Sequence, residues 1–188
     1  MKQILVSGCF CLYCAFATAA ELSGVYVEEQ ISAANGQTLL LNGVGLREKF
    51  WVDVYVGSLY LSEKSSNVEE ILSQQGAWRI QLDFVYKEVT SKKLIKAWRE
   101  GFEKNQSEQS PGQLQTRIDQ FYRYFATNVV AKDQYSFDYI PGKGTTITKN
   151  QTLLGTIPGD DFKNALLKIW LGDYPASKAL KRGMLGLN

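Results

Sequence analysis

Residues 39–61 contain two strand-like runs joined by a short charged segment, and this pattern constrains the fold more than any other part of the chain. The first run is apolar and β-prone, and its glycines, Gly43 and Gly45, permit a bend, a bulge or the close approach of another backbone. In the second run, valines alternate with other residues over positions 52–57, which is the period of two of a strand with two different faces. The sequence therefore predicts a β-hairpin that turns near Glu48 and Lys49.

Arg47 lies between these two runs, which are otherwise poor in charge. On position alone it is a surface residue, because most charges near turns are solvated. Tyr55 has the same side-chain parity, and with Arg47 paired near Trp51 it lies roughly 13 Å further along the neighbouring strand. Asp53 shares this parity and is an alternative partner for the guanidinium group. Tyr55 on its own is also compatible with a core or edge position.

The first twenty residues have the pattern of a secretory signal peptide. Lys2 precedes an apolar run over residues 4–16, and small residues follow over 17–20. The apolar run is too short to span a bilayer, which takes about 20 residues in a helix. We therefore expect a signal peptide over residues 1–20, a periplasmic or secreted protein, and no transmembrane segment in the mature chain. A lipoprotein signal ending at Cys9 is the alternative, but it leaves almost no hydrophobic region before the cut.

Cysteine and histidine usage narrows the chemistry of the mature chain. All three cysteines, Cys9, Cys11 and Cys14, precede the expected cleavage, and the chain has no histidine. A mature chain without either residue has no thiolate nucleophile, no Ser-His-Asp triad and no histidine or cysteine ligand for zinc or copper. Residues 43–45 also lack the third glycine and the following helix of a dinucleotide-binding motif. We therefore expect no metal and no cofactor.

Charge over the whole sequence gives no reason to expect a nucleic acid or an anionic membrane as partner, because 21 lysines and arginines nearly balance 19 acidic residues. Residues 21–188 form one expected domain, without repeats or a dividing linker. Strands are predicted over residues 25–31, 38–46, 50–61, 78–86, 135–140, 145–149 and 152–156. Helices are predicted over residues 68–74, after Thr90 or Ser91, after residues 110–111, and from 160 or 161 to 171. This order indicates an α+β fold, with helices on one face of an antiparallel sheet.

Two blocks of the sequence resemble the chalcone isomerase-like proteins of bacteria. The first block comprises residues 43–47, which read Gly-Val-Gly-Leu-Arg, and residues 54–55 and 59–60. The second comprises residues 161–175, 180–181 and 184–186. The resemblance implies the open-faced β-sandwich of chalcone isomerase, in which helices cover a large antiparallel sheet and a ligand cleft lies between the layers.

The resemblance also implies a binding site. In chalcone isomerases, the arginine after the glycine motif contacts the bound flavonoid, and in related fatty-acid-binding proteins an arginine and a tyrosine hold the carboxylate. By this resemblance, Arg47 and Tyr55 are the expected ligand-binding residues, and the expected partner is a hydrophobic carboxylate such as a fatty acid. A guanidinium group suits this role, because its fixed fork of N–H donors matches a carboxylate.

Catalysis is less well supported by the resemblance. Chalcone isomerases carry a threonine where this chain has Tyr55, and a tyrosine and an asparagine where Val89 or Thr90 and Lys96 fall here. The network that activates a phenolate is not reproduced, so we expect no catalytic residue. The sequence thus predicts an exported, non-catalytic protein that binds a small amphipathic carboxylate. The alternatives are an intramolecular lyase or isomerase with an altered site, and a structural or partner-binding envelope protein.

Overall fold

A computed structural model describes residues 19–106 and 112–187 of the 188-residue chain. The expected signal peptide lies almost entirely outside these residues, so export of the protein stays a prediction.

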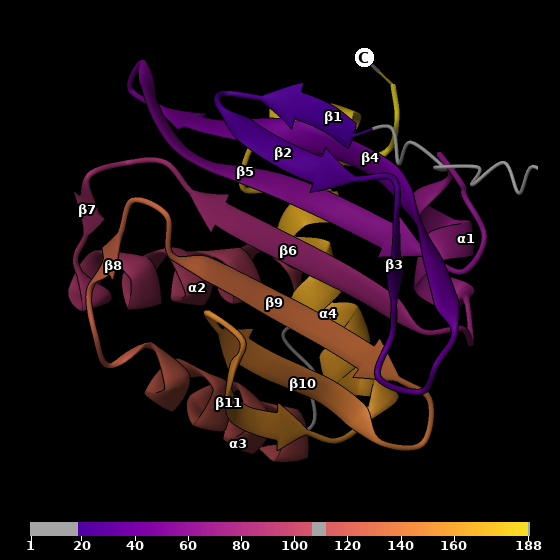
Figure 1. The fold of residues 1–188 in the computed structure, drawn as a ribbon. Helices are drawn as coiled ribbons and strands as arrows, with labels where there is room; N and C mark the ends of the chain where they lie inside the picture. The colour runs from indigo at the N-terminus through magenta and orange to yellow at the C-terminus, as the bar shows by residue number, and fades with distance from the viewer. Residues whose placement is uncertain (1–18, 107–111, 188) are drawn as a thin grey trace, which may run out of the picture.

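Within the described residues, a seven-stranded antiparallel sheet forms the centre of the molecule, in the order β11-β10-β9-β6-β5-β4-β3 (Figure 1). Its strands are β3 (Gln30–Ser32), β4 (Thr38–Lys49), β5 (Val52–Leu61), β6 (Trp78–Phe84), β9 (Gln134–Ile140), β10 (Gly144–Lys149) and β11 (Thr152–Ile157). Two further antiparallel pairs are β1 (Ala19–Leu22) with β2 (Val25–Glu28), and β7 (Glu88–Val89) with β8 (Val129–Val130).

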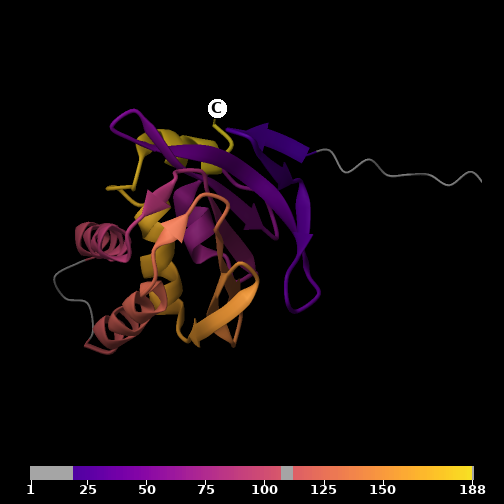
Figure 2. The same ribbon diagram turned by 60° about the vertical axis from the view of Figure 1, so that its left-hand side comes forward.

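The helical segments are α1 (Val68–Ser73), α2 (Ser91–Asn105), α3 (Gly112–Tyr122), the 3-10 helix η1 (Arg123–Phe125), α4 (Asp160–Leu171) and α5 (Lys178–Met184). Helices α2, α3 and α4 cover one face of the sheet, and the β1–β2 hairpin lies against the opposite face beside β4 (Figures 1 and 2). The predicted α+β architecture, with helices on one face of an antiparallel sheet, is confirmed.

Helix α2 shows how local sequence places a helix over the sheet. Thr90 caps its first turn, with its hydroxyl oxygen accepting a hydrogen bond from the backbone N–H of Lys93 at 3.4 Å. Leu94, Trp98 and Phe102 then recur at every fourth position and are all buried. This spacing forms one apolar stripe, which turns towards the sheet.

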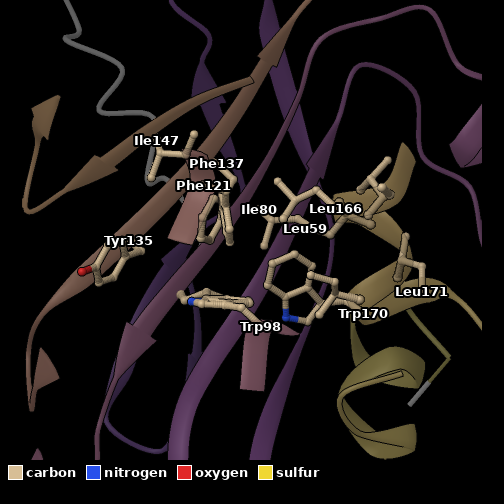
Figure 3. Close-up of a cluster of buried hydrophobic side chains, with 14 of the residues drawn as sticks. Leu59, Ile80, Trp98, Phe121, Tyr135, Phe137, Ile147, Leu166, Trp170 and Leu171 are labelled. Atoms are coloured by element: carbon tan, nitrogen blue, oxygen red, sulfur yellow. The ribbon is translucent and has the colours of Figure 1, made fainter. Parts of the chain in front are cut away.

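The main core lies between the sheet and these helices, and it is rich in aromatic side chains. Figure 3 shows Leu59 and Ile80 from the sheet close to Trp98 of α2 and Trp170 of α4. The ring centroid of Trp98 lies 5.5 Å from those of both Phe121 and Trp170. Each large side chain buried in this way contributes about 1.5–3 kcal/mol to folding. The aromatic contacts therefore fix α2, α3 and α4 relative to one another.

The hairpin of β4 and β5 turns two residues later than predicted. Both strands pair as far as Lys49 and Val52, and the turn consists of Phe50 and Trp51, with φ of 51° and 59°. A two-residue turn with positive φ at both positions fits the right-handed twist of the flanking strands. Strand pairing can therefore continue up to the turn itself. The prediction of a turn at Glu48 and Lys49 is therefore wrong.

Candidate functional site

A cleft of about 590 Å³ lies between the sheet and α2. The end of the β4–β5 hairpin, the end of β6 with the following residues, and α2 supply most of its walls, and the segment after α4 adds a further side. Its apolar lining includes Val52, Val54, Phe84, Leu94 and Trp98. The volume falls within the range of about 300–1,000 Å³ that is typical of sites for small molecules.

The structure brings Arg47 and Tyr55 together in this cleft. They are directly opposite each other on β4 and β5, and both line the cleft. Directly opposite residues of antiparallel strands have Cβ atoms about 4.5–5.5 Å apart. The predicted separation of roughly 13 Å is wrong, because the later turn pairs Arg47 with Tyr55 rather than with Trp51.

Tyr55 is a buried tyrosine at the wall of the cleft. The residue is 7% exposed, and its hydroxyl oxygen accepts a hydrogen bond from Nε1 of Trp170 at 3.1 Å. Burial raises the pKa of Tyr55, against the opposing effects of the Trp170 hydrogen bond and the positive charge of Arg47. The phenol therefore keeps its proton, and no described residue accepts it.

Arg47 is half-buried, and its guanidinium group donates a hydrogen bond to the backbone carbonyl of Glu48. No carboxylate of the described residues forms a salt bridge with it. Asp53, the alternative partner, is exposed, pairs with Glu48 across the strands and accepts a hydrogen bond from Ser23 at 3.3 Å. The guanidinium group thus retains N–H donors for a ligand.

Side chains of α2 that the sequence prediction missed form another wall of the cleft. Lys93, Ala97, Glu100 and Lys104 recur at intervals of three or four residues and line it together. The sequence did carry a signal for this wall, because residues three and four apart lie on one helix face and this face adjoins the buried stripe of α2. Trp98 contributes a buried indole Nε1–H that has no hydrogen-bond partner within the described part of the chain. The wall therefore combines charged and apolar side chains.

The glycines of β4 allow the C-terminal helix to pack directly on the strand. A Cβ atom added to Gly43 would lie 2.1 Å from the carbonyl oxygen of Gly183, and one added to Gly183 would lie 2.4 Å from that of Val44. Contacts this short do not occur between real atoms, so both positions require glycine. The two sequence blocks that carry the family resemblance are in contact here, since Gly43 packs against Met184 and Gly186. The hydrogen bond between Tyr55 and Trp170 is a second contact between the two blocks.

Three residues that fall near the tyrosine and asparagine positions of chalcone isomerases have other roles in this chain. Thr90 caps α2, Val89 is an apolar lining residue, and Lys96 forms an exposed ion pair with Glu100 at 3.8 Å. Among residues 19–106 and 112–187, no group of three or more histidine, cysteine, aspartate or glutamate side chains is placed to hold a metal ion. None of the helices in this part of the chain is long and apolar enough to span a bilayer.

Comparison with known proteins identifies a matching family model and a solved structure with a similar fold. The family model described as chalcone isomerase-like matches residues 19–186. Among solved structures, the chain is similar to a fatty-acid binding protein of Arabidopsis thaliana, with a TM-score of 0.66 and 15% sequence identity, covering 84% of this chain and 96% of that one. At this identity the similarity shows the fold alone. A comparison with curated proteins gives no match.

Proposed function

Because the chain belongs to the chalcone isomerase-like family, we propose that it binds an amphipathic carboxylate, such as a fatty acid, in the cleft beside Arg47 and Tyr55. The observation that carries this proposal is that Arg47 and the buried Tyr55 lie directly opposite each other on adjacent strands and line the same, largely apolar cleft. The Arabidopsis structure of the same fold is that of a fatty-acid binding protein, which supports the ligand class.

The two polar side chains suit an ionised carboxylate. Arg47 supplies charge-assisted hydrogen bonds, which contribute about 1.5–3 kcal/mol each, and Tyr55 supplies a neutral O–H donor. A carboxylate buried without such partners carries a large desolvation penalty. The apolar tail then packs against Val54, Phe84 and Leu94, where it displaces water from hydrophobic surface.

We propose that the ligand is bound without chemical change. Tyr55 is held protonated, which makes it a donor and a poor base, and its oxygen already accepts the Trp170 N–H. Nuclear magnetic resonance spectra of an acid recovered after incubation with the protein should match those of the starting material. A new isomer in those spectra would favour the intramolecular lyase or isomerase instead.

Export to the periplasm or the medium belongs to the same proposal, and the pattern of residues 1–20 supports it. The intact mass of the protein from its native source should correspond to a chain starting at Ala20 or Glu21. A chain that retains Met1, or one acylated at Cys9, would refute export by this route.

Calorimetric titration of a fatty acid and of its methyl ester tests the binding site. Arg47→Ala should weaken binding of the acid by roughly ten-fold or more, because it removes the charge-assisted hydrogen bonds. The affinity for the ester should change little in Arg47→Ala, because the ester keeps the apolar tail but has no negative charge. Arg123→Ala is the matched control, since Arg123 is exposed and lies outside the cleft lining.

Tyr55→Phe should weaken binding of the acid by less than Arg47→Ala, because it removes one neutral donor. Equal affinity of acid and ester in every variant would contradict the carboxylate site. Absence of binding at every chain length would contradict ligand binding altogether.

A further inference from the structure

The tip of the β4–β5 hairpin exposes two large aromatic side chains to solvent. Phe50 is 81% exposed and Trp51 is 92% exposed. Both have positive φ, a conformation that bulky residues rarely adopt. The tip projects beyond the rest of the sheet, on the same side of the molecule as α2 (Figures 1 and 2). Because both side chains are exposed and both backbones are in an unfavourable conformation, the stability of the fold does not explain why these two positions are aromatic.

A second hairpin in the same sheet provides an internal comparison. The turn between β10 and β11 also consists of two residues with positive φ, Asn150 at 49° and Gln151 at 65°. There the side chain of Asn150 donates to Asp133 at 2.8 Å and accepts from the backbone N–H of Gln134 at 2.8 Å. Polar residues therefore satisfy this turn geometry, so the turn itself does not require aromatic residues at the tip of β4–β5.

The aromatic tip lies at a positively charged edge of the cleft. Lys49 and Phe50 are themselves lining residues. The other charged lining residues are Arg47, Lys93, Lys96 and Lys104 on the basic side, and Glu88 and Glu100 on the acidic side. Basic residues thus outnumber acidic ones in the lining, whereas they nearly balance in the whole chain. The excess positive charge is local to the cleft.

We propose that Phe50 and Trp51 insert into the surface of an anionic lipid membrane, with Lys49 and the lysines of α2 facing the headgroups. Tryptophan favours the boundary between headgroups and acyl chains, because its ring is apolar and its N–H is polar. Lysines near the surface are attracted to anionic lipids. A stable protein interface takes about 800 Å² from each partner, whereas two side chains at a convex tip suffice for a shallow anchor.

This docking has a purpose only if the cleft binds an apolar carboxylate, so in that respect it rests on the proposed function. Contact at the tip places the edge of the cleft at the bilayer, where such a ligand is most concentrated. The ligand then transfers between membrane and cleft with little exposure of its tail to water.

Vesicle co-sedimentation tests the docking, using phosphatidylcholine alone and phosphatidylcholine mixed with phosphatidylglycerol. The wild-type protein should bind the anionic vesicles more strongly, and added salt should weaken that binding. Trp51→Gln, which copies a residue of the polar hairpin, should weaken binding roughly ten-fold. Tyr26→Gln is the matched control, because Tyr26 is 72% exposed on β2 but lies outside the cleft lining.

Tryptophan fluorescence gives a second readout. Trp78, Trp98 and Trp170 are buried, so a shift of emission to shorter wavelength on vesicle binding reports on Trp51. No binding of wild-type protein to either vesicle, or equal binding by Trp51→Gln, would overturn the docking proposal.

Calorimetry separates this proposal from the binding site. Trp51 does not line the cleft, so Trp51→Gln should keep the acid affinity of the wild type in the absence of vesicles. Vesicle binding without any acid binding would support docking and contradict the proposed function. Acid binding without vesicle binding would contradict docking alone.

Discussion

At the scale of single residues, the hydrogen bond between Tyr55 and Trp170 links the cleft to the core. The Tyr55 hydroxyl accepts a hydrogen bond from the indole N–H and keeps its own proton, because burial raises its pKa. The same hydroxyl therefore has a structural and a proposed binding role. Arg47, directly opposite on β4, has no such link to the core.

Tyr55→Phe should lower the free energy of unfolding by about 1–3 kcal/mol, because it leaves the buried indole N–H of Trp170 without an acceptor. Tyr135→Phe is the matched control. Its hydroxyl is also buried but has no hydrogen-bond partner among the described residues, so its removal should be neutral or stabilising. Urea unfolding measures both variants, and equal losses would show that the hydrogen bond to Trp170 contributes nothing.

At the scale of elements, the close contact between β4 and α5 depends on glycine. Gly43→Ala should destabilise the protein by about 1–3 kcal/mol, because the added methyl group forces α5 away from the strand. Gly112→Ala should be neutral or slightly stabilising, since a Cβ atom there meets no atom of the described residues within 4 Å and Gly112 begins α3. Chemical denaturation of the pair tests this, and a Gly43→Ala variant as stable as Gly112→Ala would contradict it.

Elements with strong periodicity were predictable from the sequence. Helix α2 is an example, because its cap at Thr90 and its stripe from Leu94 are local signals. The turn at Phe50 and Trp51 was not predictable, since both residue types favour strands and nothing in the sequence indicates positive φ. This error also misplaced Tyr55 relative to Arg47.

Elements that depend on tertiary contacts were missed. Strands β7 and β8 have two residues each, too few for a pattern, and they form because distant segments meet. The cleft itself was an expectation of the family resemblance alone. Side-chain periodicity shows which face of α2 is apolar but not how closely the helix approaches the sheet. The sequence analysis thus named Arg47 and Tyr55, which both line the cleft, but it did not predict their pairing or their hydrogen bonds, and their role in binding stays a prediction.

At the scale of the whole molecule, buried tyrosines make stability sensitive to high pH. Burial raises the pKa of Tyr135 to about 12, and burial with the hydrogen bond to Asp160 raises that of Tyr139 to about 12. Burial also raises the pKa values of Tyr55 and Tyr60. Above pH 10, the unfolded chain therefore loses phenol protons that the folded chain keeps, which favours unfolding.

The free energy of unfolding should accordingly fall as pH rises from about 10 towards 12. Urea unfolding at a series of pH values measures it, with phenolate absorbance recorded in parallel. Phenolate from these four tyrosines should appear together with loss of the fold. Their full titration near pH 10 in a protein that stays folded would contradict the burial argument.

The cleft is formed by parts of the chain that are far apart in sequence. Arg47 and Tyr55 come from the first half, Trp98 from α2, and Ile169 from α4 near the end. Packing of α5 on β4 and the hydrogen bond from Trp170 hold these parts in place. The cleft therefore depends on the packing of the whole described fold.

A crystal structure with a fatty acid that carries bromine at the end of its tail tests the central claim most directly. We expect the carboxylate within hydrogen-bonding distance of Arg47 and of the Tyr55 hydroxyl, and an anomalous bromine peak inside the cleft between the sheet and α2. A carboxylate in solvent, with Arg47 still bound only to the carbonyl of Glu48, would contradict the account, as would a bromine peak outside the cleft.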